Sequence, residues 1–405
     1  MSQRTDYDIL IVGGGMVGLS LACALKARDP DWRVAVLEKH QSRSGIIPPS
    51  FDARSTALSW SSEQVLRAIG CWDQIAVEAA AISTIHVSDR GHAGLTQMTA
   101  AEAGITAMGY VVENRILGSV LQQAAQTLGV EVREGVEVTQ AIPKRDGYQL
   151  QLADQKSVDC ALLVIADGAD SSTARQMGIR SSHKSYGQVA IIANIAMEHP
   201  HNGTAYERFA ESGPMALLPL PDFDGQHRAA LVWTHSEVEA ERLLSAPKDE
   251  FLAELQRQFG YRQGKLLAVG ERHSYPLALH TADEQIRQHL VVLGNASHSL
   301  HPVAGQGFNL SLRDVAALVE QLSSARAAGD AWAKLPVLER YLAAQTQDQR
   351  QTILFSDQLP KLFGMPNLPV QAGRNVGLIA MQLLTPLRRQ FARFGMGMLA
   401  GAKNG

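Results

Sequence analysis

The N-terminal part of the chain alternates between continuous apolar runs and a glycine-rich turn. Residues 7–12 (YDILIV) form a continuous apolar run, which is typical of a strand buried inside a parallel sheet. Residues 13–18 (GGGMVG) predict a turn, and residues 19–29 place apolar side chains at helical spacing. A second apolar run covers residues 33–39 (RVAVLEK). This order predicts a strand–helix–strand unit with its two strands parallel.

The hydrophobic pattern changes twice farther along the chain. Helices are expected over residues 61–70 and 114–129, and short strands then lead to a buried strand at 160–165. Between about residues 181 and 270 apolar and polar positions alternate, which predicts antiparallel strands with a helix at 248–260. After about residue 335 the pattern is helical to the end. We therefore expect an α/β fold with a second sheet inserted between pieces of the first domain.

Composition excludes several classes of function. The 405 residues suffice for two or three domains, and 37 basic against 40 acidic residues offer no basic surface for nucleic acid. Cys23, Cys71 and Cys160 are widely spaced in apolar surroundings, as expected of reduced core cysteines in a cytoplasmic protein. The apolar stretch 9–25 is short and interrupted by glycines, so we predict neither an export signal nor a membrane-spanning helix. The sequence leaves the oligomeric state open.

The first turn carries a dinucleotide-binding signature. Gly13, Gly15 and Gly18 form the pattern GxGxxG directly after a strand and at the start of a helix. Such glycines permit a tight turn, a close approach of the backbone to a pyrophosphate and close packing of the helix on the strand. Glu38 ends the second strand, where a carboxylate can accept hydrogen bonds from a ribose 2′-hydroxyl. The signature predicts bound FAD or NAD.

Two further strand-to-loop turns occur downstream, which a simple NAD dehydrogenase would not need. Asp167 and Gly168 follow the buried strand at 160–165, and Gly294 and Asn295 follow another apolar run. The second turn continues as GNASHSLHPVAGQGFNL over residues 294–310 and opens a helix. Backbone amides at 305–307 would then be free to point outward from the helix N-terminus.

In these motifs the chain resembles the group A flavoprotein monooxygenases of the para-hydroxybenzoate hydroxylase fold. The resemblance rests on residues 13–18, on FDARSTALS at 51–59, on Asp167-Gly168 and on residues 294–314. It is strongest to the ubiquinone-biosynthesis hydroxylases, and residues 294–310 resemble the branch that hydroxylates 2-polyprenyl-6-methoxyphenols. The resemblance implies a Rossmann-type FAD-binding domain, an inserted and mainly antiparallel sheet domain for substrate, and a helical C-terminus.

The resemblance also implies domain boundaries. The FAD-binding domain would be discontinuous, the substrate domain would lie in two insertions, and a helical region would close the chain. The expected segments are 1–78, 98–180 and 272–335 for the FAD-binding domain, 79–97 and 181–271 for the substrate domain, and 336–405 for the C-terminal region.

Single residues receive cofactor roles from the same resemblance. Arg54 would lie along the flavin, and Arg115 would contact the nucleotide part of FAD, with Gln123 on the same side of its helix. Asp167 would serve both FAD and NAD(P)H, the co-substrate. The other cofactor-binding residues implied are Gly13, Gly15, Gly18, Glu38, Gly168, Gly294, Asn295, Gly305, Gly307 and Asn309.

The helix start after residue 304 would be the catalytic part. There the amides of Gly305, Gln306 and Gly307 would face the flavin and stabilise the negative charge of its reduced form. Pro302, just before this turn, would shape the substrate pocket. Asn295 departs from the family pattern, since most members have Asp there; asparagine keeps an acceptor oxygen but removes a charge beside the phosphates.

His298 and His301 suggest a metal site only superficially. No third ligand lies near them, and Pro302 follows directly, so no metal is expected. Three weaker candidates for the substrate pocket are His183, Tyr186 and Tyr206, for each of which a structural role is the default interpretation.

The resemblance implies an enzyme that uses FAD, NAD(P)H and O2 to insert one oxygen atom into a polyprenylated (methoxy)phenol of ubiquinone biosynthesis. Two alternatives stay open: a soluble aromatic-acid hydroxylase of the salicylate type, and a redox-inert FAD-binding component of an assembly. An aromatic-acid hydroxylase would need a fixed cation for the substrate carboxylate. Relatives that work with other quinone-pathway proteins imply a similar assembly here.

The C-terminal stretch 375–400 carries the remaining hypothesis. Leu378, Ile379, Met381 and nearby leucines precede Arg388, Arg389 and Arg393. An amphipathic helix that buries its Leu/Met face on the protein is the default interpretation. The basic cluster leaves a peripheral contact with the inner membrane as the alternative, because a lipid substrate has to be reached.

Overall fold

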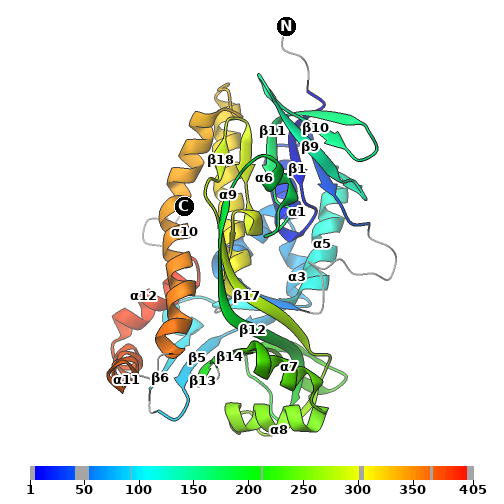
Figure 1. Cartoon of the computed structure of the whole chain (residues 1–405). Coiled ribbons are helices and arrows are strands. Elements are labelled where there is room, and N and C mark those ends of the chain that lie inside the picture. Colours follow the sequence, from blue (N-terminus) through cyan, green and yellow to red (C-terminus); the bar gives the residue numbers. More distant parts are fainter. Residues whose placement is uncertain are drawn as a thin grey trace.

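The computed structural model describes residues 5–41, 54–92, 94–210, 213–300, 305–364 and 368–398. An eight-stranded, mainly parallel sheet forms its upper body (Figure 1). Along this sheet the order is β18-β19-β11-β1-β2-β8, and a hairpin of β9 and β10 pairs with β11. Its strands are β1 (Tyr7–Val12), β2 (Val34–Glu38), β8 (Glu131–Glu134), β9 (Val138–Lys144), β10 (Gly147–Leu152), β11 (Ser157–Ile165), β18 (Ile286–Arg287) and β19 (Leu290–Val292).

Three helices pack together against one face of this sheet, and their core explains the continuous apolar runs. They are α1 (Met16–Arg28), α5 (Asn114–Thr127) and α9 (Gln306–Ala327). Ile9 and Ile11 of β1 share a fully buried cluster with Leu21 of α1 and Leu318 of α9. The cysteines Cys23, Cys71 and Cys160 are all buried and unpaired, as predicted.

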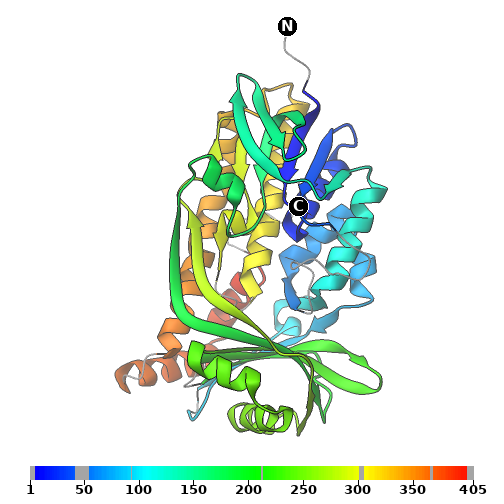
Figure 2. The same ribbon diagram turned by 45° about the vertical axis from the view of Figure 1, so that its right-hand side comes forward.

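The second body is a nine-stranded, mainly antiparallel sheet, seen at the bottom of Figures 1 and 2. Its order is β20-β17-β12-β15-β14-β13-β5-β6, with β16 paired to β12. The helices α7 (Glu237–Ser245) and α8 (Lys248–Phe259) bury one face of it around Trp233 and Phe251. Its strands are β5 (Thr84–Asp89), β6 (Leu95–Thr99), β12 (Ser181–Met197), β13 (Thr204–Ala210), β14 (Gly213–Phe223), β15 (Gln226–Ser236), β16 (Leu266–Val269), β17 (His273–Ala282) and β20 (His298–Ser299).

A small three-stranded sheet lies between the two bodies. It has the order β3-β7-β4, and α2 continues directly from the end of β3. Its strands and the remaining short helices are β3 (Ser55–Ser59), β4 (Ala80–Ile82), β7 (Gly109–Glu113), α2 (Trp60–Ile69), α3 (Trp72–Ala76), α4 (Ala100–Ala103) and α6 (Ser172–Gln176).

The strand pairing crosses two of the predicted domain boundaries. The predicted substrate domain ends at residue 271, but β17 pairs with β12 through Ala282, and β20 adds residues 298–299 to the same sheet. At the predicted start, residue 79, the following strand β4 pairs with β7 in the small sheet and not with the nine-stranded sheet. Local alternation identifies a strand but not its partner, so the pattern could not assign these strands to a sheet.

The C-terminal region is helical, as predicted, in the part the structure describes. Its helices are α10 (Leu335–Gly364), α11 (Leu368–Leu383) and α12 (Thr385–Gly395). The long α10 runs beside α9, whereas α11 and α12 lie against β6 and α4 (Figure 1). None of the described helices has the length and apolar character needed to cross a bilayer.

The predicted burial of the Leu/Met face is only partly correct. Leu378 is buried, but Ile379, Leu383, Leu384 and Leu387 are 40–74% exposed. The basic cluster divides as well. Arg388 is buried and donates to Glu102 (Nη2–Oε1 2.7 Å), while Arg389 and Arg393 are exposed. The outer side of α11 and α12 therefore combines exposed leucines with two arginines.

Candidate active site

A single large cavity of about 1340 Å³ connects the carboxyl edge of the parallel sheet with the nine-stranded sheet. Its walls come from the turn after β1, the end of β11, the start of α9, the inner face of the second sheet and the helices α10 to α12. This volume exceeds that of a usual small-ligand pocket and has room for a large cofactor and a second ligand.

The first glycine turn forms one end of the cavity. Gly13 has φ +113°, and a Cβ atom there would lie 2.3 Å from the Ala166 carbonyl oxygen. A Cβ atom on Gly18 would lie 2.0 Å from the Gly13 oxygen. Gly15 caps α1 without a side-chain bond, so the first amides of the helix remain available to an anion. Gly13 and Gly15 line the cavity, whereas Gly18 packs behind the turn.

Glu38 lines the same end of the cavity and has a structural role that the sequence did not predict. Its Oε2 accepts a hydrogen bond from the Gly14 amide (2.6 Å), and its Oε1 accepts one from the His40 amide (2.9 Å). Each carboxylate oxygen has a second lone pair for a ligand hydroxyl. The side chain can therefore hold the turn and still accept a ribose hydroxyl.

Asp167 provides a buried acceptor that the protein itself does not satisfy. It follows β11 and lines the cavity together with Gly168. One carboxylate oxygen, Oδ2, accepts from the Thr173 amide at 3.4 Å, while the buried Oδ1 has no hydrogen-bond partner among the residues that the structure describes. A buried carboxylate oxygen without a donor is costly, so this atom indicates a ligand that donates a hydrogen bond.

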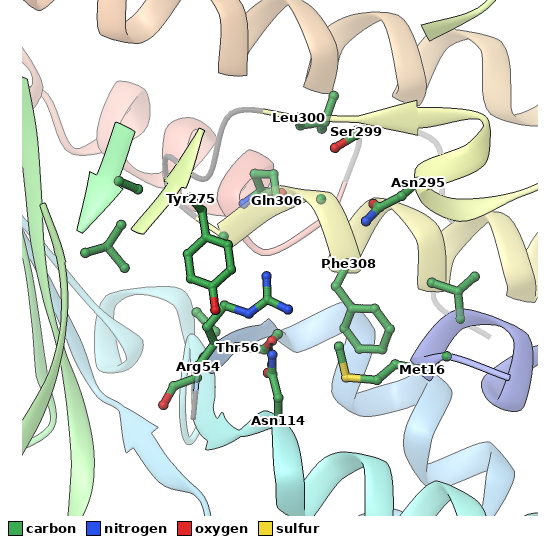
Figure 3. A pocket seen from close by; sticks show the side chains of 18 of the residues that line it. Met16, Arg54, Thr56, Asn114, Tyr275, Asn295, Ser299, Leu300, Gln306 and Phe308 are labelled. Atoms are coloured by element: carbon green, nitrogen blue, oxygen red, sulfur yellow. Dashed lines mark hydrogen bonds between the residues drawn. The ribbon is translucent and has the colours of Figure 1, made fainter. Parts of the chain in front are cut away.

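The start of α9 forms the middle of the cavity wall (Figure 3). Gly305 adopts φ +60° and caps the helix without a side-chain bond, so no capping side chain occupies the backbone amides at the start of α9. Gly305, Gln306 and Gly307 line the cavity, and a Cβ atom on Gly307 would meet no atom within 4 Å. Nearby, Asn295 also lines the cavity, and Gly294 packs against Val17 behind it.

Arg54 lies across the cavity from α9. Its guanidinium stacks 4.5 Å above the ring of Tyr275, a residue of β17 that the sequence did not single out (Figure 3). Beside it, the Thr56 hydroxyl donates to the Asn114 side-chain oxygen at 2.6 Å. Arg54 thus joins the small sheet to the substrate sheet at the centre of the cavity.

Two further predicted site residues of the described part of the chain, Arg115 and Gln123, do not lie in the cavity wall. Arg115 is absent from the lining and pairs with Glu113 (Nε–Oε2 2.6 Å). Gln123 is exposed, and its neighbour Gln122 lines the cavity instead. Pro302 falls outside the described residues, so its predicted role stays a prediction.

Asn309 has a positioning role at the start of α9. Its side-chain oxygen accepts from the Ser59 amide (2.8 Å) and the Ser62 hydroxyl (2.7 Å), and its nitrogen donates to the Ala57 and Gly305 oxygens (2.8 Å each). These four bonds use the full hydrogen-bonding capacity of an amide. The Asn309 side chain therefore uses these bonds to position the start of α9, and the cofactor contact implied by the resemblance stays a prediction.

His298 has a similar structural role. Its Nε2 lies 2.7 Å from Asp314 Oδ2, both side chains are 1% exposed, and Gln349 donates to the other Asp314 oxygen (3.0 Å). No cluster of three potential metal ligands occurs among the residues that the structure describes. The histidine and the carboxylate thus tie the loop before α9 to α9 and α10.

A family model described as an FAD binding domain matches residues 6–354. The chain is also 36% identical over 393 residues to the ubiquinone hydroxylase UbiL of Rhodospirillum rubrum. This alignment covers 97% of this chain and 90% of that protein. The chain belongs to the FAD-binding monooxygenase family. The prediction that the motifs supported is confirmed.

Other relatives agree with this membership. The 3-demethoxyubiquinol 3-hydroxylase of Escherichia coli is 31% identical over 411 residues, covering 96% of this chain and 98% of that protein. Among solved structures, the probable FAD-dependent monooxygenase PqsL of Pseudomonas aeruginosa aligns with a TM-score of 0.76 over 92% of this chain and 99% of that chain, at 20% identity. The latter comparison supports the fold alone.

The residues at the first end of the cavity fit the FAD of this family. The uncapped start of α1 offers amides to a pyrophosphate, and Glu38 offers carboxylate oxygens to a ribose. The unpaired Oδ1 of Asp167 can accept a hydrogen bond from the cofactor. The amides at the start of α9 can face an anionic ring.

The other end of the cavity is apolar apart from a few side chains. Glu207 of β13 lines it, and burial raises the pKa of this carboxyl to about 8. Tyr206, one of the weaker sequence guesses, also lines the cavity. Two other guesses lie elsewhere: His183 is exposed, and Tyr186 donates to Asp357 (2.9 Å).

The two asparagines of the α9 motif predict opposite outcomes for the same substitution. Asn295→Asp should retain FAD, because the side chain is exposed in the cavity and an acceptor oxygen is kept. Asn309→Asp should destabilise the fold by about 2–4 kcal/mol, because the two donated bonds would be lost in a buried site. Flavin absorbance per protein and urea unfolding check these results. Complete loss of FAD in Asn295→Asp would instead show that the amide nitrogen is needed as a donor.

Glu207 predicts a pH-dependent stability. Unfolding releases its proton at neutral pH, because the folded pKa is near 8 and the unfolded pKa is about 4.3. The free energy of unfolding is therefore highest below the unfolded pKa of about 4.3. It falls as the pH rises from there through the folded pKa of about 8. Glu207→Gln should therefore raise Tm at pH 8 by a few degrees, with the gain disappearing near pH 4. Glu239→Gln, on an exposed pair with Arg242, should give no such gain at pH 8.

Proposed function

We propose that the protein is a ring hydroxylase that uses FAD, NAD(P)H and O2 to insert one oxygen atom into a polyprenylated (methoxy)phenol of ubiquinone biosynthesis. The observation that carries this proposal is one continuous cavity that joins the FAD-binding motifs to an apolar sheet face. Relatives named as a ubiquinone hydroxylase and a demethoxyubiquinol hydroxylase support the same substrate class.

The residues that line the cavity indicate which part of it binds the cofactor and which part binds the substrate. When bound, reduced FAD supplies the electrons that activate dioxygen. The glycine turn and Glu38 hold the nucleotide, and the α9 amides stabilise negative charge on the ring. Arg54 and Tyr275 border the space between the ring and the substrate sheet. The sheet and the helices α10 to α12 exclude water from the reacting centre.

The aromatic-acid alternative needs a cation for the substrate carboxylate, and the arginine that α11 contributes to the cavity is already paired. Arg374 of α11 lines the cavity, but its guanidinium donates to Asp89 (3.2 Å), and both side chains are buried. Glu207 adds a carboxyl to the sheet face. A substrate carboxylate would meet a neutralised arginine and an acidic side chain, so a neutral phenol fits the site better.

An apolar tail has a path through the same wall. Leu378 and Met381 of α11 and Phe391 and Phe394 of α12 line the cavity. The opposite side of these helices carries the exposed Leu383, which is 74% accessible. We infer that the outer side of α11 and α12 rests on the anionic surface of the inner membrane, where a prenyl tail can enter. A quinone-pathway assembly remains part of the proposal.

Deletion of the gene tests the function directly. Mass spectrometry of the host's quinone pool should find an accumulated polyprenyl methoxyphenol, because the hydroxylation step would be missing. The purified protein should be yellow and should oxidise NAD(P)H several-fold faster with a prenylated phenol. A normal quinone pool would refute the assignment. If the protein binds FAD but phenols do not accelerate NAD(P)H oxidation, it is a redox-inert component of an assembly. If the purified protein is colourless, a simple NAD dehydrogenase becomes the better hypothesis.

Vesicle binding tests the membrane contact. Leu383→Glu combined with Leu387→Glu should weaken cosedimentation with anionic phosphatidylglycerol vesicles about tenfold, because two apolar contacts are lost and negative charge is added. Val77→Glu changes a residue that is 80% exposed beyond α3 and serves as the control. Equal binding of all three proteins would contradict the contact.

A further inference from the structure

Glu207 occupies an unusual position in the substrate sheet. In the register of the strands it lies opposite Ala216 of β14 and Val87 of β5, and all three line the cavity. Its neighbours two positions away, Ala205 and Phe209, line the cavity as well. Side chains alternate between the faces of a strand, so Glu207 lies in the middle of an apolar surface.

The opposite face of β13 shows that the location of this acid is not a consequence of general polarity. Arg208 points the other way and donates to the Gln258 carbonyl at 3.0 Å. On that face an acidic side chain would lie beside the guanidinium of Arg208 and could form an ion pair with it. Instead the carboxyl faces small side chains, Ala205 and Ala216, which leave space above it.

No charged group of the cavity neutralises Glu207. The carboxyl makes no hydrogen bond or ion pair with any described residue, and burial is the cause of its raised pKa. Other ionisable groups on the packed elements are engaged elsewhere. Asp89 of β5 pairs with Arg374 of α11 (3.2 Å), Arg54 stacks on Tyr275, and Asp357 of α10 accepts from Lys184 (3.0 Å).

A neutral carboxyl in such a place has a specific binding capacity. As an acid it has one O–H donor and a carbonyl acceptor, so it can donate to a ring oxygen and accept from a hydroxyl at the same time. It costs little to cover with an apolar ring and tail, provided that the ring supplies the hydrogen bond. A ring carboxylate would be disfavoured, because two carboxyl groups at one site cannot both ionise.

We propose that Glu207, the carboxyl set among the apolar side chains of the substrate sheet, binds the oxygen substituent of the substrate ring and selects uncharged phenols over aromatic acids. This inference rests on the proposed function and assigns its substrate-contacting residue. The hydrogen bond fixes the rotation of the ring about the axis of its tail. That rotation decides which ring carbon is presented to the reacting centre.

The proposal has a defined pH dependence. Below about pH 8 the carboxyl keeps its proton and binds the phenol. Above that pH it ionises, and a charged group in the apolar wall retains water that the ring would have to displace. Binding of a phenol should therefore weaken as the pH rises through 8, while a variant with an amide at this position should not respond.

Calorimetric titration of the FAD-loaded protein with two probes tests the inference. Ortho-geranylphenol carries the hydroxyl, and geranylbenzene is the same molecule without it. Wild type should bind the phenol about tenfold more tightly, as expected for one buried hydrogen bond. Glu207→Leu should bind both probes equally, and Glu207→Gln should keep the preference because an amide also donates and accepts. Ortho-geranylphenol affinity should fall above pH 8 in wild type and stay constant in Glu207→Gln.

Each result separates this inference from the proposed function. Wild type that hydroxylates ortho-geranylphenol while Glu207→Leu keeps the tenfold preference would overturn the role of Glu207 alone. A turnover rate that rises through pH 8 in wild type but not in Glu207→Gln would also overturn it, because the carboxylate would then act as a base. No phenol-stimulated NAD(P)H oxidation in wild type would instead count against the proposed function. Glu207→Gln supplies the test if Glu207→Leu fails to fold.

Discussion

The close backbone contact between Gly13 and Ala166 is the constraint on which the site depends. It holds the end of β1 against the end of β11, with the Ala166 amide donating to the Val12 carbonyl at 2.7 Å. The Leu293 amide donates to the Ile165 carbonyl at 2.8 Å and adds the third turn. Three segments far apart in the sequence thus end at one edge of a parallel sheet, where α/β proteins bind their ligands.

Buried polar side chains then fix the third segment without using its amides. Asn309 holds the start of α9 to β3 and α2, and the pair of His298 and Asp314 holds the preceding loop. These side-chain bonds hold the start of α9 in place, and Gly305 caps the helix without a side-chain bond. The polar residues of the motif are therefore as important for geometry as the glycines.

The sequence predicts those features of the fold that depend on local apolar periodicity and glycine spacing. The strand–turn–helix units around Gly13 and Gly305 follow from apolar periodicity and glycine spacing, and the cavity-facing positions of Asp167 and Asn295 were also predicted. The partner of β17 could not be predicted, because alternation does not identify which strand lies alongside.

Glu207 was missed for a related reason. Alternation over residues 204–210 indicates that Ala205, Glu207 and Phe209 share a face, but the same pattern describes a face covered by helices. Only the assembled sheet shows that α7 and α8 cover the other side. The positioning role of Asn309 was also missed, because a motif resemblance preserves residue type and not the direction of the side chain.

The length of β12 limits how the cavity can change shape. This strand of 17 residues pairs with β17 from Ser181 to Ile192 and with β15 up to Met197, so one ribbon runs out of the upper body and through the lower sheet (Figure 2). A rotation of one body against the other would have to bend this ribbon and break its ladders. The helix α11 is attached to the edge of the second sheet through side chains instead, because Asn375 accepts from the Gly94 amide and Gln382 accepts from the Gln97 amide of β6 (2.8 Å each). The continuous pairing of β12 therefore fixes the distance between the two ends of the cavity.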